Sequence, residues 1–299
     1  ENRGELRRLR LGTKGTLGER IGFKIELNTD SSEDVTLADA YLEWKLEDGQ
    51  TKLRVGQFKT PNSLDEQTSS RFISTIERSA FTDAFGFDRR VGAGVFWSGA
   101  NSTVSAGLFT NNIEADSSSR GYALAARGTM AMPVSDSVLF HGGLSFRYRD
   151  QRDNAADLRY RQRPYSHLPG RIISTGFIAE SDFFTGAEAA LISERFWLAG
   201  EYGRTDTSCS FCADDPVLQG GYLEAGLFFR GSRTYKGGKF DRPQVYSPVT
   251  KGGSGAFSFV ARFDTLDLDD GSIDGGELDT FVLGADWWPT RHTRVSINY

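Results

Sequence analysis

The chain has 299 residues, of which 12% are aromatic and 25% are charged, and its formal net charge is -5. This aromatic content argues against intrinsic disorder, and the acidic balance argues against a nucleic-acid-binding protein. The longest stretch without an ionisable side chain, Val91–Ile113, is interrupted throughout by Gly, Ser, Asn and Thr. A membrane-spanning helix needs about 20 predominantly apolar residues, so the sequence excludes a helical membrane protein. A transmembrane β-barrel passes the same test, because its alternating strands average out in any hydropathy window.

Apolar and polar residues alternate with a period of two along most of the chain. Each such run predicts a strand with one apolar and one polar face. In chain order the runs lie at residues 9–11, 23–27, 38–44, 52–55, 91–97, 138–146, 223–229, 257–263 and 281–287. Together with the turn signals, they predict roughly 14 antiparallel strands.

Two kinds of connection separate the predicted strands. Short turn signals lie at residues 47–49, 98–101, 193–194 and 289–290. Longer polar connections lie at residues 56–90, 148–182, 204–218, 230–255 and 264–277. Long connections at one end and short turns at the other are typical of an outer-membrane barrel.

A soluble β-sandwich also shows alternating strands, so the two architectures have to be weighed. The barrel is favoured because the polar positions carry long charged side chains, such as Arg8, Arg10 and Lys24. A Lys or Arg that faces lipid at the membrane midplane costs about 2–4 kcal/mol, so a charged face must line a water-filled lumen. Aromatic residues also gather near strand ends, as interfacial girdles do: Trp44, Trp97, Trp197, Trp287, Trp288 and Tyr299. The sequence therefore predicts one domain over residues 1–299, an all-β transmembrane antiparallel β-barrel.

Several motifs resemble one family. The segment Leu53–Pro61 (LRVGQFKTP), followed by Thr68–Ile73 and Glu77–Ser79, is similar to the third-loop region of the phosphate-selective porin O and P family. Further resemblances are Arg89–Gly92, to the return into the next strand, Leu158–Pro164, to an arginine-alternating segment, and Leu283–Pro289 with Arg294–Tyr299, to the penultimate hairpin. The resemblance covers most of the chain and is strongest over residues 53–92.

The resemblance implies a homotrimeric porin in the outer membrane of a Gram-negative bacterium. Each barrel would have 16 strands and a third loop, here residues 56–90, folded inward to narrow the pore. Inorganic phosphate or related small anions would cross by passive diffusion, and outer-membrane lipid and lipopolysaccharide would surround the barrel. The family continues by another hairpin beyond Tyr299, so we expect parts of the N- and C-terminal strands to be missing from this sequence.

Basic side chains are the candidate anion-binding groups. A guanidinium offers a planar fork of donors that matches two phosphate oxygens, and a channel needs several moderate sites in series. Arginines two residues apart share one strand face, as at Arg159, Arg161 and Arg163. The predicted pore-lining residues are Arg8, Arg10, Lys24, Arg54, Lys59, Arg71, Arg78, Arg89, Arg90, Arg127, Arg147, Arg159, Arg161 and Arg163.

The alternative for these residues is that they are solvated loop charges or partners of luminal carboxylates. We favour this alternative for Arg149, Arg152 and Arg171. Connection 56–90 carries five basic and five acidic side chains, so its net charge is zero. A constriction loop would direct the basic groups to the pore and tie the acids to backbone donors or wall arginines. An ordinary ion-paired loop would give weak selectivity.

The remaining motifs are assigned structural roles. The acidic segment 264–279 does not fit the EF-hand template and is predicted to be a solvated outer loop. Cys209 and Cys212 are assigned as a loop disulfide or two unpaired thiols rather than a metal or redox site. His141, His167 and His292 lie in separate segments and no hydrolase or nucleotide-binding motif occurs, so no enzyme, cofactor or metal is predicted.

Three functions stay open on the sequence alone. The leading hypothesis is a porin for phosphate or related anions. The second is a general diffusion porin with weak or cation-tolerant selectivity. The third is a structural barrel of an envelope complex, with its lumen plugged.

Overall fold

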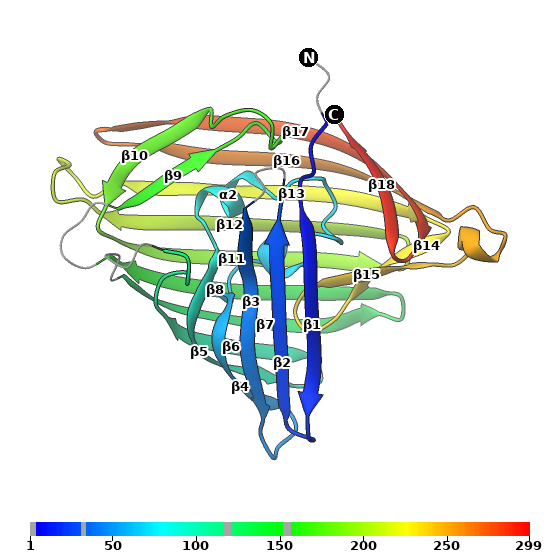
Figure 1. The fold of residues 1–299 in the computed structure, drawn as a ribbon. Helices are drawn as coiled ribbons and strands as arrows, with labels where there is room; N and C mark the ends of the chain where they lie inside the picture. Colours follow the sequence, from blue (N-terminus) through cyan, green and yellow to red (C-terminus); the bar gives the residue numbers. More distant parts are fainter. Residues whose placement is uncertain (1–3, 31–33, 116–120, 152–156) are drawn as a thin grey trace.

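The computed structural model describes residues 4–30, 34–115, 121–151 and 157–299. Within these ranges, 14 strands form one antiparallel sheet, as the alternation predicts (Figure 1). They are β1 (Leu9–Leu17), β2 (Ile21–Thr29), β3 (Val35–Lys45), β4 (Thr51–Lys59), β5 (Arg89–Ser98), β6 (Ser102–Phe109), β7 (Tyr122–Ser135), β8 (Val138–Asp150), β11 (Ser181–Ser193), β12 (Phe196–Ser208), β13 (Val217–Phe229), β16 (Ala256–Asp270), β17 (Ile273–Thr290) and β18 (Thr293–Asn298).

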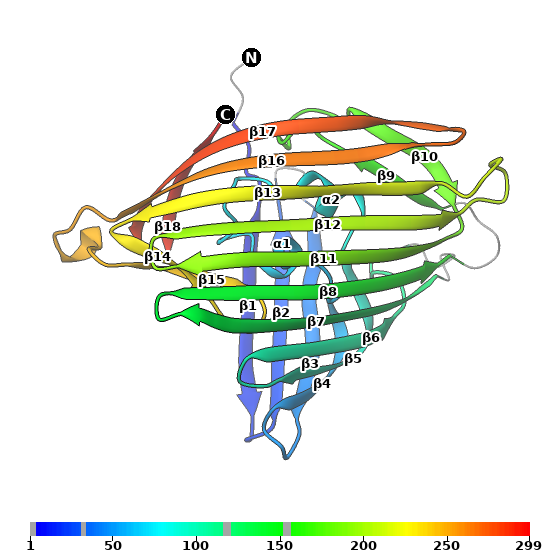
Figure 2. The same cartoon turned by 180° about the vertical axis from the view of Figure 1, so that it is seen from behind.

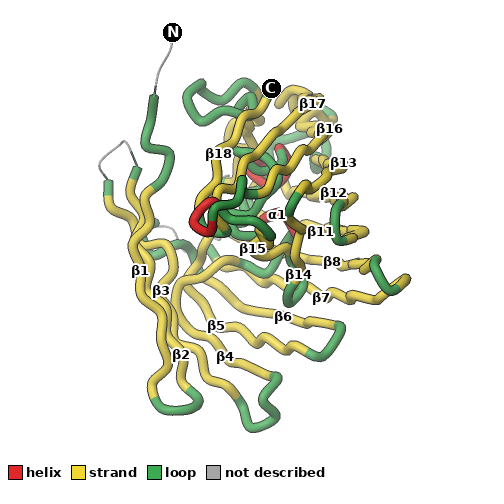
Figure 3. Tube along the Cα trace, turned by 90° about the vertical axis from the view of Figure 1, so that its right-hand side faces the viewer, coloured by secondary structure: helices red, strands yellow, loops and turns green. Residues whose placement is uncertain are grey.

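Each strand of this sheet pairs with the next strand of the sheet along the chain, from β1 to β18. Seen from the two sides and along the curve, the sheet wraps around an interior (Figures 2 and 3). Among the described residues no pairing joins β1 to β18, so the sheet is open between its first and last strands. The sheet is therefore a curved barrel wall with one open seam.

The two faces of the wall differ as the period of two requires. On β8, Leu144 and Phe146 point outward and are 56% and 44% exposed, whereas Ser145 and Arg147 point inward and are 2% and 1% exposed. Successive side chains of a strand lie on opposite faces, so the apolar set forms a continuous outer surface. No helix in the described ranges is long and apolar enough to cross a membrane.

The predicted aromatic girdle is only partly present. Trp44 and Trp287 are exposed on the outer surface near strand ends. Trp197 and Trp288 point inward instead, where their indole N–H groups donate to Glu224 Oε1 (2.8 Å) and Ser258 Oγ (3.1 Å). Adjacent residues of a strand face opposite sides, so Trp287 and Trp288 cannot both belong to an outer girdle.

The connection from β4 to β5, residues 60–88, folds into the interior as predicted. It contains two short helices, α1 (Leu64–Gln67) and α2 (Ala80–Ala84), and α2 packs against β13 and β16. Phe81 of α2 and Phe85, the C-cap residue of this helix, join a buried cluster with Leu266 of β16 and Leu218 of β13. These aromatic residues hold the loop against the far wall.

Two further hairpins interrupt the order of the sheet. β9 (Leu158–Gln162) pairs with β10 (Ile173–Ala179) in the connection from β8 to β11, and Leu158 and Tyr160 join the cluster around α2. β14 (Gly231–Tyr235) pairs with β15 (Phe240–Val245) in the connection from β13 to β16, followed by the 3₁₀ helix η1 (Val249–Lys251). The predicted long connections 148–182 and 230–255 are therefore not loops throughout.

The hairpin β14–β15 also lies at the unexpected end of the barrel. Residues 196 and 227 are register partners, so β13 ends beside the short turn between β11 and β12. The connection from β13 to β16 thus starts at the short-turn end, opposite to the end from which residues 60–88 enter. The prediction that the long connections lie at one end was wrong for residues 230–255.

The acidic segment 264–279 is not a loop. β16 continues to Asp270 and β17 begins at Ile273, so only residues 271 and 272 form the turn. Leu266 and Leu268 are 1% and 0% exposed because they point inward onto the buried cluster, while Asp267 lies on the other face. The period of two continues through the acidic residues, and it outweighs their charge density in deciding the secondary structure.

Candidate pore and its basic lining

Carboxylates on the wall anchor the backbone of the inward loop. Glu201 on β12 accepts hydrogen bonds from the N–H groups of Leu64 (2.8 Å) and Asp65 (2.6 Å). Asp264 on β16 accepts from Ala80 N–H (3.1 Å), and Glu224 on β13 accepts from the Ser74 hydroxyl (2.7 Å). Buried carboxylates are tolerated only where donors satisfy them, so these contacts fix where the loop crosses the interior.

Wall arginines bind the loop carbonyls in the same way. Arg147 on β8 donates to the carbonyl oxygens of Phe85 (2.7 Å) and Gly86 (2.8 Å). Arg294 on β18 donates to Ile73 O (2.6 Å). These contacts tie both guanidinium groups to the backbone of the loop, so we assign Arg147 and Arg294 to support of the loop.

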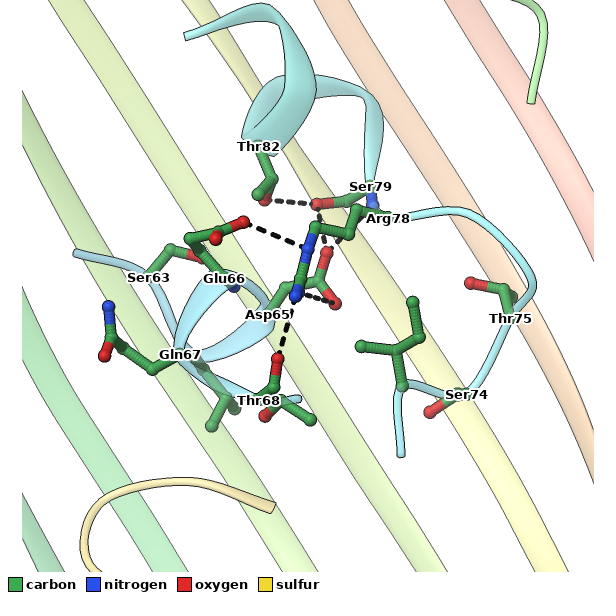
Figure 4. A network of polar contacts seen from close by, with 12 residues as sticks. Ser63, Asp65, Glu66, Gln67, Thr68, Ser74, Thr75, Arg78, Ser79 and Thr82 are labelled. Atoms are coloured by element: carbon green, nitrogen blue, oxygen red, sulfur yellow. Dashed lines mark hydrogen bonds and ion pairs between the residues drawn. The ribbon is translucent and has the colours of Figure 1, made fainter. Parts of the chain in front are cut away.

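A polar network centred on Arg78 holds the two helices of the loop together (Figure 4). Arg78 donates to Thr68 O (2.9 Å) and forms an ion pair with Glu66 (3.0 Å). Asp65 accepts hydrogen bonds from the N–H (2.9 Å) and hydroxyl (3.1 Å) of Ser79, and lies 3.8 Å from Arg262 of β16. Asp65 is thus tied to backbone and to a wall arginine, which is how we expect the acids of a constriction loop to be arranged.

Two cavities meet beside this loop. One has a volume of about 560 Å³ and the other about 800 Å³. Six residues line both, and five of the six are basic. These shared residues, which we call the basic junction, are Arg8, Arg10, Lys59, Ser70, Arg71 and Arg89.

The basic residues of the junction differ in how their charges are compensated. Lys59 pairs with Glu66 (2.5 Å), Arg89 with Asp39 (2.7 Å) and Arg10 with Glu26 (3.6 Å). Among the described residues, Arg8 and Arg71 form no ion pair. Desolvation, followed by the like charges of Arg10 and Arg7, lowers the pKa of Arg8 to about 10. Arg8 therefore stays charged at neutral pH, and an anion beside it would relieve the repulsion.

The excess of basic groups continues on both sides of the junction. Of the residues that the structure describes, ten basic side chains and two carboxylates line the larger cavity. There the Arg54 guanidinium lies over the rings of Tyr41 (4.2 Å) and Phe96 (4.3 Å). Nine basic side chains, His167 and four carboxylates line the smaller cavity. The interior is thus strongly basic although the whole chain carries a formal charge of -5.

The structure brings nine of the 14 predicted residues to these cavities. Five of them, together with Ser70, form the basic junction. Two more, Lys24 and Arg54, line the larger cavity, and the last two, Arg78 and Arg163, line the smaller one. The other five line neither cavity: Arg90, Arg127, Arg147, Arg159 and Arg161.

Four of these five have another defined environment. Arg90 donates to Asn111 Oδ1 (2.9 Å), Arg127 pairs with Glu188, and Arg147 binds the inward loop. In the predicted ladder, Leu158 and Tyr160 are the residues that face the buried cluster. Arg159 lies on the opposite face of β9 and stacks on Phe177 (4.6 Å). The spacing of the ladder was read correctly as a strand, but β9 belongs to an inserted hairpin and not to the wall.

The cavities also contain basic residues that sequence reasoning missed. Lys14 continues the alternation of Arg8 and Arg10 along β1, so the period of two could have identified it. Lys239 and Arg242 belong to the β14–β15 hairpin, whose entry into the interior no local pattern predicts. The missed residues are Arg7, Lys14, Lys239 and Arg242.

Two of the three arginines that we expected to be solvated charges or partners of luminal carboxylates form ion pairs with carboxylates. Arg149 pairs with Asp182 (3.0 Å), and Arg171 pairs with Asp83 (3.0 Å) while also lining the smaller cavity. Arg152 lies outside the described residues. Cys209 and Cys212 form a disulfide in the connection between β12 and β13, in agreement with the structural assignment.

A curved antiparallel wall with an apolar outer face, a basic interior and an inward loop defines a porin-type barrel. Solved outer-membrane proteins share this fold. OprB of Pseudomonas putida, in a high-pH structure, superposes with a TM-score of 0.58 at 12% identity, over 98% of this chain and 81% of OprB. A loop-deletion mutant of OmpT from Vibrio cholerae superposes with a TM-score of 0.57 at 9% identity, over 98% and 83% of the two chains.

The sequence model of the family described as phosphate-selective porin O and P matches residues 1–299. The chain belongs to this family, which places it in the outer membrane. It is 35% identical over 316 aligned positions to an uncharacterized protein of Caulobacter vibrioides, covering 99% of this chain and 62% of that protein. The chain thus spans about three fifths of the length of this relative.

Proposed function

We propose that this porin conducts small anions by passive diffusion, with a preference for phosphate or related oxyanions. The observation that carries the proposal is the basic junction, where both cavities meet and where no carboxylate of the described residues lines both. An ion that passes from one cavity to the other would meet five basic side chains. Guanidinium and ammonium groups replace the hydration shell of an oxyanion with charge-assisted hydrogen bonds.

Arg8 and Arg71 would be the main binding groups of the junction. Neither forms an ion pair among the described residues. Arg71 Nε donates to Ser69 Oγ (3.4 Å), which leaves the terminal nitrogens of both guanidinium groups for an ion. The paired residues Lys59, Arg89 and Arg10 would contribute potential rather than tight binding, because nearby carboxylates offset their charge. Several moderate sites in series allow an ion to leave as readily as it enters.

A general diffusion porin is the second candidate. Glu66, Glu77, Asp83 and Asp88 line the smaller cavity together with its basic residues. A lining of mixed sign would give weak selectivity. The two candidates differ in the ratio of anion to cation permeability and in the affinity for phosphate.

The first experiment measures ion selectivity of the full-length protein in planar bilayers. Under a gradient of KCl, the reversal potential should show that chloride is more permeant than potassium. Added inorganic phosphate should block the chloride current at low concentration. A preference for potassium would refute the proposal, and equal permeability without phosphate block would establish the general porin. No conductance would favour the structural barrel.

The second experiment tests the junction itself. Replacing both Arg8 and Arg71 with Gln should weaken phosphate block about tenfold, equivalent to about 1.4 kcal/mol. The matched control is Lys45→Gln, which removes an exposed basic side chain that lines neither cavity. Equal phosphate block in the wild type, double variant and control would show that the junction does not bind the ion.

The homotrimer expected from the resemblance is part of this proposal. The mass of the detergent-solubilised full-length protein, measured by light scattering with correction for bound detergent, tests it. A mass of one subunit would contradict the trimer without affecting the conclusion on ion selectivity.

A further inference from the structure

The β14–β15 hairpin is held on the inner wall by a buried polar cluster. The Tyr235 hydroxyl lies 2.7 Å from His141 Nδ1, and His141 Nε2 lies 2.9 Å from Glu188 Oε1. Arg127 donates to Glu188 Oε2 (3.1 Å) and to the carbonyl oxygen of Gly238 (2.6 Å). Two wall side chains, His141 and Arg127, thus contact the hairpin directly, and Glu188 orients both.

These wall residues come from three neighbouring strands. Arg127 lies on β7, His141 on β8 and Glu188 on β11, and all three are buried, His141 fully. Leaving one member of a buried charged cluster without its partner is costly, so each residue fixes the rotamers of the others. The cluster is therefore a rigid platform for the hairpin.

Two adjacent glycines show how closely the hairpin tip approaches this platform. Gly238 has a φ of +78°, and a Cβ there would lie 2.8 Å from Thr129 Oγ1 and 3.0 Å from Thr103 Oγ1 of the wall. Gly237 has a φ of +58°, yet a Cβ there would meet nothing within 4 Å. Both positions favour glycine for their backbone conformation, but only Gly238 also needs it for contact with the wall.

The hairpin carries basic groups into the larger cavity. Lys239 and Arg242 both line that cavity, and Arg242 stacks on Phe72 of the inward loop (5.0 Å). Arg242 also donates to Arg291 O (3.0 Å), in the turn between β17 and β18. Desolvation, followed by the like charges of Arg127, Arg54 and Lys24, lowers the pKa of Lys239. The position of the hairpin on the wall therefore determines where two basic side chains lie in the cavity.

We propose that His141, Glu188 and Arg127 are positioning residues that seat the β14–β15 hairpin and thereby set the width and basic lining of the larger cavity. On the hairpin, these wall residues contact Gly238 through its carbonyl oxygen and Tyr235 through its hydroxyl. The effect on ion block rests on the proposed function, whereas the position of the hairpin does not.

The first test measures the position of the hairpin without reference to ions. A cysteine introduced as Lys239→Cys is allowed to react with a polyethylene-glycol maleimide, and the native cysteines do not compete because they form a disulfide. Adding Tyr235→Phe or Gly238→Ala should raise the labelling rate about fivefold, as expected for the loss of one hydrogen bond or a comparable contact. Adding Gly237→Ala introduces backbone strain without a wall contact and should therefore raise the rate much less than Gly238→Ala does.

The second test measures conductance in otherwise wild-type channels. Tyr235→Phe and Gly238→Ala should change the single-channel conductance and weaken phosphate block, whereas Gly237→Ala should have a much smaller effect on both. Arg127→Ala should behave like Gly238→Ala, and Arg127→Lys should restore part of the block because it can still donate to Gly238 O. A merely structural role in barrel stability would predict no such rescue, provided that all variants show the heat-modifiable mobility of a folded barrel.

The outcomes distinguish failure of the proposed positioning of the hairpin, which we call the seat, from failure of the proposed function. Wild-type labelling rates in both Tyr235→Phe and Gly238→Ala would overturn the seat. Equal effects of Gly237→Ala and Gly238→Ala would overturn it as well, because backbone strain and not wall contact would then be the cause. Increased labelling in a channel without anion preference would support the seat and refute the proposed function.

Discussion

At the scale of single residues, the arginines of this protein perform two different tasks. Arg147, Arg262 and Arg127 are buried on the wall, and each donates at least two hydrogen bonds to backbone carbonyls or carboxylates. Arg8 and Arg71 are exposed to the cavities and form no ion pair within the described parts of the chain. A guanidinium with satisfied donors fixes structure, whereas one with free donors can bind an ion.

This distinction gives different expectations within the predicted ladder of β9. Arg163 lines the smaller cavity, so Arg163→Gln should weaken phosphate block about twofold, as expected for a partly exposed charge. Arg159 stacks on Phe177 and lines neither cavity, so Arg159→Gln should leave phosphate block unchanged. The measurement is the block of chloride current in planar bilayers. A larger effect at Arg159 than at Arg163 would contradict the placement of Arg163 beside the smaller cavity.

At the scale of elements, residues 60–88 form a loop that is ordered by its contacts and not by its secondary structure. Its two helices have four and five residues, so helix propensity contributes little. Hydrogen bonds to Glu201, Asp264 and Arg147, together with the packing of Phe81 and Phe85, hold it instead. These partners are distant in the sequence, which is why the sequence could predict the inward direction only by resemblance.

The ion pairs of α1 give the loop a defined dependence on pH. Burial raises the pKa of Asp65, but Arg262, Arg78 and hydrogen bonds from Ser79 outweigh it and hold the pKa below the ordinary 3.8. A carboxylate whose pKa is lower in the folded state stabilises the fold above its unfolded pKa, and this contribution is lost as the pH falls through the folded pKa.

We therefore expect the contribution of Asp65 to holding the loop to be complete from neutral pH down to about pH 4 and to be lost only below that range. In single-channel recordings, the difference in current noise between the wild type and Asp65→Asn should be constant down to about pH 4 and shrink at lower pH. In Asp65→Asn the noise should be raised already at neutral pH. Fluctuations that begin near pH 6 in the wild type would show that another group controls the loop.

At the scale of the whole molecule, the alternation of side chains separates two environments across one wall. The outer face carries the exposed apolar residues, and the inner face carries the ion pairs and both cavities. Net charge describes neither face. The formal charge of -5 averages a basic interior with acidic residues elsewhere, so it does not predict which ions the interior attracts.

A charged side chain introduced at the centre of the outer face should destabilise the folded barrel. Leu144 lies in the middle of β8 and is 56% exposed on the outer surface. Leu144→Arg should destabilise the folded barrel by about 2–4 kcal/mol in a lipid bilayer, whereas Leu144→Val should cost much less. The free energy of unfolding in lipid vesicles, measured by urea titration, checks this. Equal stability of the two variants would place Leu144 away from lipid.

The sequence by itself determined the strands of the wall and the faces of their side chains, because both follow from a local period of two. That period identified Arg8, Arg10, Lys24 and Arg54 as interior residues, and it would also have included Lys14. The motifs of residues 53–92 indicated the family and the inward loop.

Only the tertiary structure decided which basic residues meet. The junction combines residues of β1, β4 and β5 with residues of the inward loop, and the cavity beyond it receives Lys239 and Arg242 from a hairpin at the opposite end. It also showed that Arg127 and Arg147 hold inserted segments in place. The physical reason is that hydrogen bonds between distant strands and loops determine these positions, and a local pattern contains no information on such partners.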